Sequence, residues 1–167
     1  SPSVVNIWTI KKWKAWQEQS NEFGFKFNRR VVKTGLFPNG SGVVIEKGLI
    51  VTNFHVISDA FNQNQELIVE NHLGKTVKTQ ILGFDSEADI AVLGIIDSID
   101  LKPFKIRKNI DQVKVGESVI AIGNPQGLGQ SFSKGIVSAI NRTFQDKKGN
   151  FIQTDASINP GNSGGAL

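Results

Sequence analysis

Short apolar runs separated by turn residues fill most of the chain, and this pattern constrains its fold more than any other feature. The runs are rich in valine and isoleucine and are about as long as single strands, which is typical of β-structure. Two of them meet at Lys47-Gly48 within residues 42–54, which is a hairpin signal. Helical signal is confined to residues near 55–60. We expect an all-β sandwich or barrel, with further strands at 4–10, 66–70, 76–82, 90–96, 118–122, 130–140 and 151–154 and a turn at 146–150.

A boundary between two parts of the chain is expected at residues 101–111. This stretch is charged, contains Pro103 and lacks clean periodicity, so we interpret it as a linker. The chain then divides into a part at 1–100, a linker at 101–112 and a part at 113–167. About seven expected strands precede the linker and about three follow it.

Residues 11–30 (KKWKAWQEQSNEFGFKFNRR) place aromatic rings among charged side chains. Trp13 and Trp16 are three residues apart, as on one face of a helix. Two interpretations stay open. The segment is a loop that covers its own core, or its aromatic residues mark a contact between subunits, because exposed aromatic clusters are typical of interaction surfaces.

Composition excludes several classes of chemistry. Cysteine is absent and only two histidines occur, so we expect no disulfides, thiolate metal sites, cysteine nucleophiles or multi-histidine metal sites. The formal net charge is +4, with the basic residues scattered in short groups. We find no nucleic-acid-binding motif and expect no nucleic acid partner.

Membrane and targeting signals are also missing from the sequence. No segment approaches the ~20 apolar residues of a membrane span, and no basic-then-apolar leader opens the chain. Methionine does not occur at all. We therefore expect a mature or trimmed form whose targeting segment is not part of this sequence.

A glycine-rich stretch near the end of the sequence is the strongest candidate for chemistry. Gly161-Asn162-Ser163-Gly164-Gly165 places one serine among three glycines, which can turn sharply and point successive N–H groups one way. We interpret Ser163 as a nucleophile and the N–H groups of Gly161 and Ser163 as an oxyanion hole. The alternative is an ordinary surface loop. A serine hydroxyl is inert without a base, so the rest of the chain must supply one.

His55 and His72 are the only candidates for that base. His72 lies in a polar turn before a strand, whereas His55 follows the apolar run at 49–54. A histidine at such a strand end is often a capped or core residue, but the need for a base raises the odds of His55. We therefore favour His55 as the base of Ser163.

A carboxylate must hold the imidazole in one tautomer. Asp89 opens the apolar strand at 90–96, where a partly buried carboxylate is costly unless it is paired. Asp85 is better interpreted as a turn residue, and Asp97 and Asp100 lie in the polar segment after the strand. We favour Asp89 as the partner of His55, with a strand-end cap as the alternative.

Together, these stretches resemble the triad motifs of HtrA/Deg serine proteases. The matching segments are TNFHV at 52–56, DSEADIAVL at 85–93 and GNSGG at 161–165, in the order His, Asp, Ser. The resemblance covers nearly the whole chain, since further matches are PSVVNI at 2–7, GSGVVI at 40–45, IAIGNPQGLGQ at 120–130, GIVSA at 135–139 and IQTDASINP at 152–160.

The resemblance implies a chymotrypsin-like fold of two antiparallel β-barrels with the active site between them. His55 and Asp89 would come from the first barrel and Ser163 from the second, which is incomplete in residues 1–167. Ile158 matches a position that helps line the primary specificity pocket. Residues 11–39 match the variable regulatory loop of the family. Phe54 departs from the polar residue that many relatives carry before the histidine, and the usual PDZ domain is absent from these residues.

Family membership would also imply unfolded polypeptide substrates, a homotrimer, and a location outside the bacterial cytoplasm or in an organelle. The leading hypothesis is a serine endopeptidase that works through an acyl-enzyme without a metal or organic cofactor. The alternatives are a protease-like module that holds polypeptides without cleaving them and a fragment that is inactive because it is incomplete. The short stretch after Ser163 leads us to expect further strands beyond Leu167.

Overall fold

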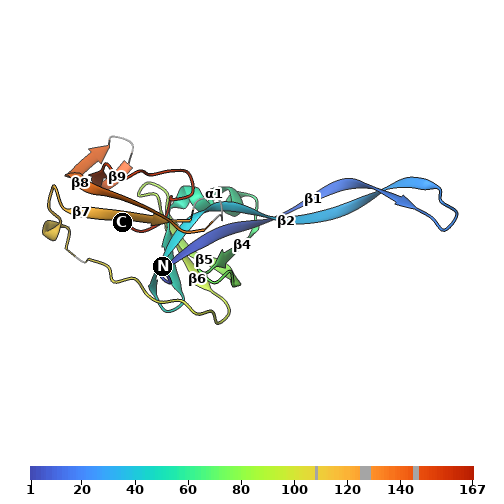
Figure 1. Ribbon diagram of the computed structural model, residues 1–167, viewed down its shortest axis with the longest axis horizontal. Helices are drawn as coiled ribbons and strands as arrows, with labels where there is room; N and C mark the ends of the chain where they lie inside the picture. Colours follow the sequence, from blue (N-terminus) through green and yellow to red (C-terminus); the bar gives the residue numbers. More distant parts are fainter. Residues whose placement is uncertain (108, 125–128, 145–146) are drawn as a thin grey trace.

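The described residues of the computed structural model form a closed six-stranded barrel and a separate three-stranded sheet (Figure 1). The structure describes residues 1–107, 109–124, 129–144 and 147–167. Around the barrel, neighbouring strands are antiparallel and follow the order β1-β2-β3-β6-β5-β4. The barrel strands are β1 Val4–Ser20, β2 Lys26–Glu46, β3 Leu49–Thr52, β4 Glu66–Glu70, β5 Thr76–Asp85 and β6 Ile90–Ile95.

The second sheet contains β7 Ser118–Gly123, β8 Ser131–Phe144 and β9 Lys147–Thr154, paired in that order. It does not close within the described residues. The prediction of an all-β fold with an incomplete second barrel is therefore confirmed. In the described part of the chain, three strands follow the linker as expected, and six rather than about seven precede it.

Alternating apolar residues build the core of the first barrel. In β3, Ile50 is fully buried while Leu49 and Val51 are half-buried, as the two-residue period of a strand requires. The fully buried side chains Ile7, Leu93 and Val69 meet it from other strands. The helix α1 (Phe54–Asn62) packs against this core through Val56, Ile57 and Ala60, and it lies where helical signal was expected.

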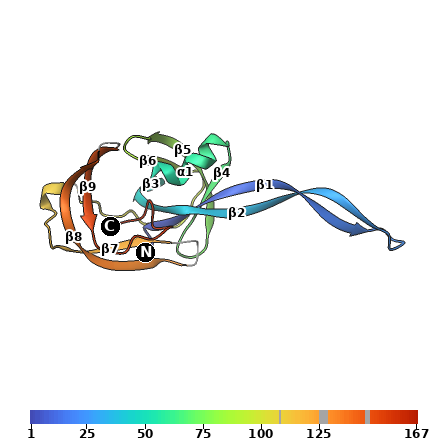
Figure 2. The same ribbon diagram turned by 90° about the horizontal axis from the view of Figure 1, so that it is seen from above.

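Beyond the barrel, β1 and β2 continue as a two-stranded arm that projects away from the body (Figures 1 and 2). The strand β4 pairs with β1 only as far as Ile10, opposite Glu66. From there the pairing of β1 with β2 continues alone, from Lys11 opposite Gly35 to Ser20 opposite Lys26. We call residues 11–35 the arm.

The interpretation of residues 11–30 as a loop that covers its own core is wrong, because they form strands and a turn of the exposed arm. Trp13 and Trp16 lie on β1 rather than on a helix, and their odd spacing places them on opposite faces of the strand. At the turn, Asn21 Oδ1 accepts hydrogen bonds from the N–H groups of Phe23 and Phe25, at 3.1 and 2.9 Å. Sequence pattern missed the strands because both faces are exposed, so no apolar alternation marks them.

The linker at 101–112 runs along the first barrel. The N–H of Phe104 donates to the carbonyl of Val44 at 2.7 Å, and a short 3₁₀ helix spans Ile110–Gln112. Arg107 then reaches Glu117 with two hydrogen bonds of 3.0 and 2.8 Å, just before β7. Of the turn expected at 146–150, residue 146 lies outside the described residues. Residues 147–150 belong to β9, so the expectation is wrong there.

Candidate active site

The glycine-rich stretch 161–165 folds as two successive turns between the barrel and the second sheet. The N–H of Asn162 donates to the Asn159 carbonyl at 3.0 Å, and the N–H of Gly165 donates to the Asn162 carbonyl at 2.9 Å. Ala166 then pairs with Ile122 of β7 through hydrogen bonds of 2.8 and 2.9 Å. Ser163 lies half-buried at the centre of the glycine-rich stretch. We call residues 159–166, which include both turns and Ala166, the serine loop.

Close packing requires glycine at position 164. Its φ of +79° is in the left-handed region, and a Cβ there would lie 2.2 Å from both the Ser41 carbonyl oxygen and Thr52 Oγ1. Any side chain would therefore meet both backbone strain and overlap. The glycine after Ser163 thus allows the serine loop to lie directly against strands β2 and β3.

Ser41 holds the serine loop against the barrel. This fully buried residue of β2 donates from its N–H to the Ser163 carbonyl at 2.8 Å and from Oγ to the Gly161 carbonyl at 2.7 Å. Its Oγ also accepts from the N–H of Asn124 at 2.8 Å, and its carbonyl accepts from Thr52 Oγ1 at 2.7 Å. Ser41 was not predicted from the sequence, in which its only signal is its place in the Gly-Ser-Gly segment at 40–42.

His55 and Asp89 are paired as expected. His55 stands in the first turn of α1, and Asp89 immediately precedes β6. The ring Nδ1 of His55 lies 2.8 Å from Asp89 Oδ2, and the N–H of His55 donates to Oδ1 at 2.9 Å. One carboxylate thus binds the ring and also one of the helix N–H groups that lack partners inside a helix.

The exposure of this pair fits a hydrogen-bonded base that is open to a reactant. The Asp89 side chain is 15% exposed and the His55 side chain 56% exposed. An Nδ1–H directed at the carboxylate leaves Nε2 as the acceptor on the open side of the ring. Asp89 adopts a φ of 55°, in the left-handed region that aspartate tolerates better than most residues.

Asn53 connects the histidine–aspartate pair to the serine loop. It precedes α1 at the N-cap position, but its side chain makes no cap hydrogen bond to the helix. Instead Nδ2 donates to the Asp89 carbonyl at 2.9 Å, and Oδ1 accepts from the N–H of Gly164 at 2.7 Å. The two ends of this amide therefore set the distance between Asp89 and the serine loop. Sequence reasoning did not identify this role.

The structure brings His55, Asp89 and the serine loop to one place, where the barrel meets the second sheet. Within the described residues, no hydrogen bond joins Ser163 Oγ to His55. The N–H groups of Gly161 and Ser163 likewise donate to no acceptor in that part of the chain. Ile158 is 60% exposed.

The other candidate residues have the structural roles that the sequence suggested. His72 is exposed in the turn after β4, a turn organised by Asn71 Oδ1, which accepts from the N–H groups of Leu73 and Lys75. Asp85 accepts from the N–H groups of Glu87 and Ala88 and so stabilises a turn.

The described residues contain neither a candidate metal site nor a helix that could span a membrane. None of their His, Cys, Asp and Glu side chains gather in a group of three or more able to hold a metal ion. None of their helices is long and apolar enough to cross a membrane.

Comparison with known proteins defines the class. Residues 40–167 match the family model described as a trypsin-like peptidase domain, and this match covers most of the chain, so the chain belongs to that family. Its relatives are of the HtrA/Deg type, which confirms the resemblance drawn from the motifs.

Three relatives illustrate the similarity. The periplasmic pH-dependent serine endoprotease DegQ of Escherichia coli is 46% identical over 132 residues, which cover 77% of this chain and 28% of DegQ. The serine endoprotease DegS of Haemophilus influenzae is 47% identical over 172 aligned positions, covering all of this chain and 45% of DegS. The solved HtrA-type protease AlgW with a decapeptide superposes with a TM-score of 0.80 at 34% identity, over 99% of this chain and 51% of AlgW. The chain thus spans about half or less of each relative.

Proposed function

We propose that the chain is the peptidase domain of a serine endopeptidase in which Ser163, His55 and Asp89 form the catalytic triad. The observation that carries the proposal is the double contact of Asp89 with His55, at 2.8 and 2.9 Å, beside a serine loop bonded to the same barrel. An orienting carboxylate, an open imidazole and a serine on a glycine-rich turn are the parts that acyl transfer needs. Membership of the trypsin-like peptidase family supports the same reaction.

In the proposed reaction, Ser163 Oγ attacks the scissile carbonyl carbon while His55 Nε2 takes the hydroxyl proton. The C–N bond then breaks, and His55 returns that proton to the leaving amine, which leaves an acyl group on Ser163. Water, deprotonated by His55, then attacks the ester; the C–O bond to Ser163 breaks, His55 returns the proton to Ser163 Oγ, and the acid is released. Asp89 holds the ring and stabilises the imidazolium in both halves of the cycle.

The N–H groups of Gly161 and Ser163 are the proposed oxyanion hole. Since neither is used by an acceptor in the described part of the chain, both are free to bind the developing oxyanion. Ile158 is the proposed contribution to the primary specificity pocket, a role that rests on the family resemblance.

Substrates, assembly and location are proposed by analogy with the family. We propose unfolded polypeptides as substrates, an extracytoplasmic location by analogy with the periplasmic relatives, and a homotrimer. The exposed aromatic residues of the arm are the candidates for subunit contact, whereas Trp8 is engaged within the barrel, where its Nε1 donates to Glu70 Oε2 at 2.9 Å. Light scattering on the full-length protein tests the trimer, and a monomer at micromolar concentration would contradict it.

The triad is tested with the full-length protein and casein. We expect Ser163→Ala and His55→Ala each to remove nearly all turnover, and the double variant to lose little more than either, because triad members act as a unit. His72→Ala is the matched control and should keep parental activity. Casein cleavage by purified Ser163→Ala at the parental rate would overturn the assignment.

A serine-directed phosphonate separates the enzyme from a module that only holds polypeptides. We expect one adduct, located on Ser163 by peptide mass mapping, and no adduct in His55→Ala. Casein binding by the parent protein without adduct formation or cleavage would instead establish the binding module.

A further inference from the structure

The arm presents both of its faces to solvent. In the part of the chain that the structure describes, no third strand pairs with its two strands beyond Ile10 and no helix covers them. Large apolar side chains are exposed along its whole length, including Phe23 at 84%, Phe25 at 72%, Trp16 at 65% and Val32 at 64%. Two strands alone are marginally stable in water, so a long ribbon with this much exposed apolar surface calls for an explanation.

Contacts inside the arm account for some of its aromatic residues but not for those at the tip. Trp13 lies edge-on to Phe37 with ring centroids 6.0 Å apart, and the Arg30 guanidinium lies 5.3 Å from the Trp16 ring centroid. These cross-strand contacts stabilise the ribbon itself. Among the described residues, Phe23 and Phe25 take part in no ring or cation contact, so their apolar surface at the turn is left unused.

The arm also carries more positive charge than the whole chain. Residues 11–35 contain seven Lys and Arg but only two Glu, a formal charge of +5. The whole chain has +4, so the remaining residues sum to −1. One of the two acidic residues is already paired, since Glu18 lies 2.8 Å from Lys26 Nζ. The charge of this protein is therefore concentrated on one projecting element.

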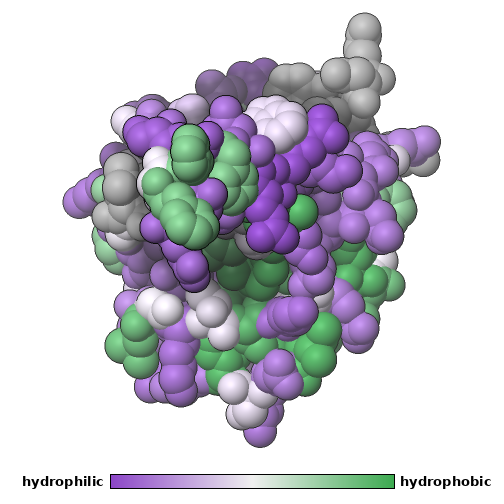
Figure 3. Space-filling view, turned by 90° about the vertical axis from the view of Figure 1, so that its right-hand side faces the viewer, coloured by the Kyte–Doolittle hydropathy of each residue, from purple (hydrophilic) through white to green (hydrophobic). Residues whose placement is uncertain are grey.

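The arrangement of cations and rings favours a lipid surface over a protein surface. Lys14 stands opposite Val32, Trp13 opposite Lys33 and Trp16 opposite Arg30, so neither face of the ribbon is purely apolar. Figure 3, which looks at the molecule from the side of the arm, shows hydrophobic and strongly hydrophilic side chains intermixed. The buried centre of a protein interface excludes lysine, whereas the headgroup layer of a bilayer accepts aromatic rings and cations side by side.

We propose that the arm docks onto the surface of an anionic phospholipid bilayer. Phe23 and Phe25 enter the boundary between headgroups and acyl chains, and Lys26, Arg29 and Arg30 contact the phosphates around them. At ~3.3 Å per residue the tip stands roughly 35–40 Å from the barrel. The candidate active site therefore stays in water while the tip is bound.

Vesicle flotation with the full-length protein tests the proposal. Vesicles of phosphatidylcholine with added phosphatidylglycerol should bind the protein at low salt, and vesicles of phosphatidylcholine alone should not. Binding should weaken as salt is added, because exposed charges are screened. Tryptophan emission should shift to shorter wavelength on binding, and lipids brominated near the headgroup should quench it.

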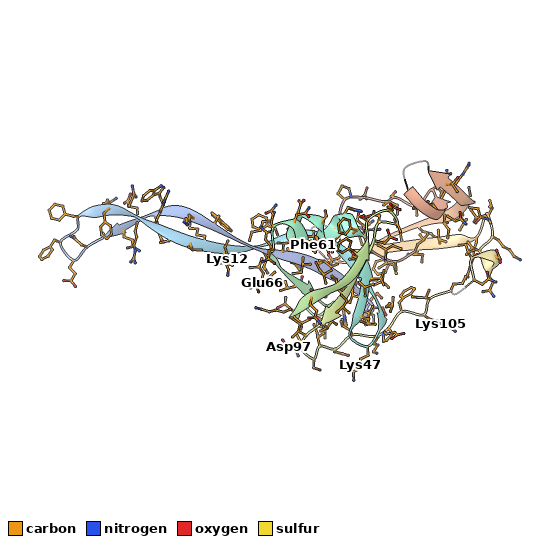
Figure 4. All side chains as sticks on the ribbon, turned by 180° about the vertical axis from the view of Figure 1, so that it is seen from behind. Lys12, Lys47, Phe61, Glu66, Asp97 and Lys105 are labelled. Atoms are coloured by element: carbon orange, nitrogen blue, oxygen red, sulfur yellow. The ribbon has the colours of Figure 1, made fainter. Side chains whose placement is uncertain are left out.

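Charge variants identify the arm as the contact. Arg29→Gln combined with Arg30→Gln should lower the vesicle association constant roughly 25-fold, because each cation contributes a factor of about five to that constant. Lys47→Gln combined with Lys105→Gln is the matched control, because it removes the same charge from the body, away from the arm (Figure 4). That control should leave binding unchanged.

Tip variants test the aromatic part independently. Phe23→Ser combined with Phe25→Ser should weaken binding at least tenfold and abolish quenching by the brominated lipids. Leu73→Ser, at a body residue that is 66% exposed, is the control and should bind as the parent does. All three positions are exposed, so the variants should keep the parental circular dichroism and unfolding midpoint.

Three results would overturn the proposal. The first is failure of the parent protein to bind the anionic vesicles at low salt. The second is an equal loss of binding in the body and arm variants, which would mean that net charge alone controls it. The third is an arm or tip variant that binds vesicles as the parent does but has a different oligomeric mass by light scattering. That result would mean that the arm contacts a second copy of this chain.

Discussion

Asn53 illustrates how one side chain can set the geometry of residues that are distant in the sequence. Its amide bonds Asp89 on one side and Gly164 on the other, across sequence separations of 36 and 111 residues. Because it contacts backbone groups rather than a reactant, we assign it a positioning role. The relative placement of the histidine–aspartate pair and Ser163 then depends on this amide.

We expect Asn53→Ala to lower kcat by roughly 10–100-fold with little change in KM, because small misplacements of catalytic groups are costly. Asn71→Ala is the matched control, since the Asn71 side chain also binds backbone groups, through three hydrogen bonds, but in the turn after β4. Steady-state kinetics on a peptide substrate measures both variants. Equal kcat losses in the two would show that Asn53 has only a structural role.

Gly164→Ala should cost more than backbone strain alone. The added Cβ would overlap the Ser41 carbonyl and Thr52 Oγ1, so we expect about 2–4 kcal/mol, seen as lost unfolding stability or as a displaced serine loop. Gly48→Ala is the control, because Gly48 has a φ of +84° but no atom within 4 Å of the added Cβ. Urea unfolding and the rate of phosphonate labelling measure both, and similar results for the two glycines would contradict the prediction.

The pairing of His55 with Asp89 was predictable from the sequence, whereas the residues that hold this pair beside the serine loop were not. Few imidazoles and few suitable carboxylates exist in this chain, so elimination led to His55 and to Asp89. Ser41 and Asn53 act through hydrogen bonds to groups more than 30 residues away. Serine and asparagine are common in turns and caps, so nothing in the local pattern distinguishes such a role.

The linker is attached to the segment before β7 by an ion pair between Arg107 and Glu117. Arg107 binds both carboxylate oxygens of Glu117, and the N–H of Lys114 approaches the same carboxylate at 3.3 Å. The hydrogen bond from Arg107 is the main reason that the pKa of Glu117 lies below its ordinary value. Both groups are exposed, so the contribution of the pair to stability is small.

A lowered carboxylate pKa gives a definite sign to the pH dependence. The stabilisation is present above the ordinary pKa of 4.5 and is lost as the pH falls through the lower value of the folded state. Below about pH 5 the thermal unfolding midpoint should decrease less steeply with falling pH in Glu117→Gln than in the parent protein. Arg107→Gln should do the same, and the double variant should add nothing. Additive effects in thermal unfolding would contradict the pairing.

Strand positions were predicted well where one face of the strand is buried. The strands from β3 to β9 lie where apolar runs were expected, because burial on one side selects apolar residues. The arm was missed for the opposite reason. Its strands bury neither face, and aromatic and charged residues alternate without a period that distinguishes a strand from a loop.

At the scale of the whole molecule, the arm contributes nothing to the core. No residue from 11 to 35 belongs to the buried cluster of the barrel in the described structure. Replacing residues 12–34 by an Asn-Gly turn should therefore change the free energy of unfolding by less than about 1 kcal/mol. Urea denaturation measures this, and a loss of several kcal/mol would show that the arm supports the barrel.

The serine loop also connects the two parts of the molecule, because it is hydrogen-bonded to both of them. Ser163, Gly161 and Gly164 are bonded to Ser41 and Asn53 of the first part, while Ala166 pairs with Ile122 of the second. These hydrogen-bonded residues of the loop are adjacent or two positions apart in the sequence, so no flexible segment separates them. The two halves therefore cannot separate without moving Ser163, the proposed nucleophile, so peptidase activity should report directly on whether the halves are joined.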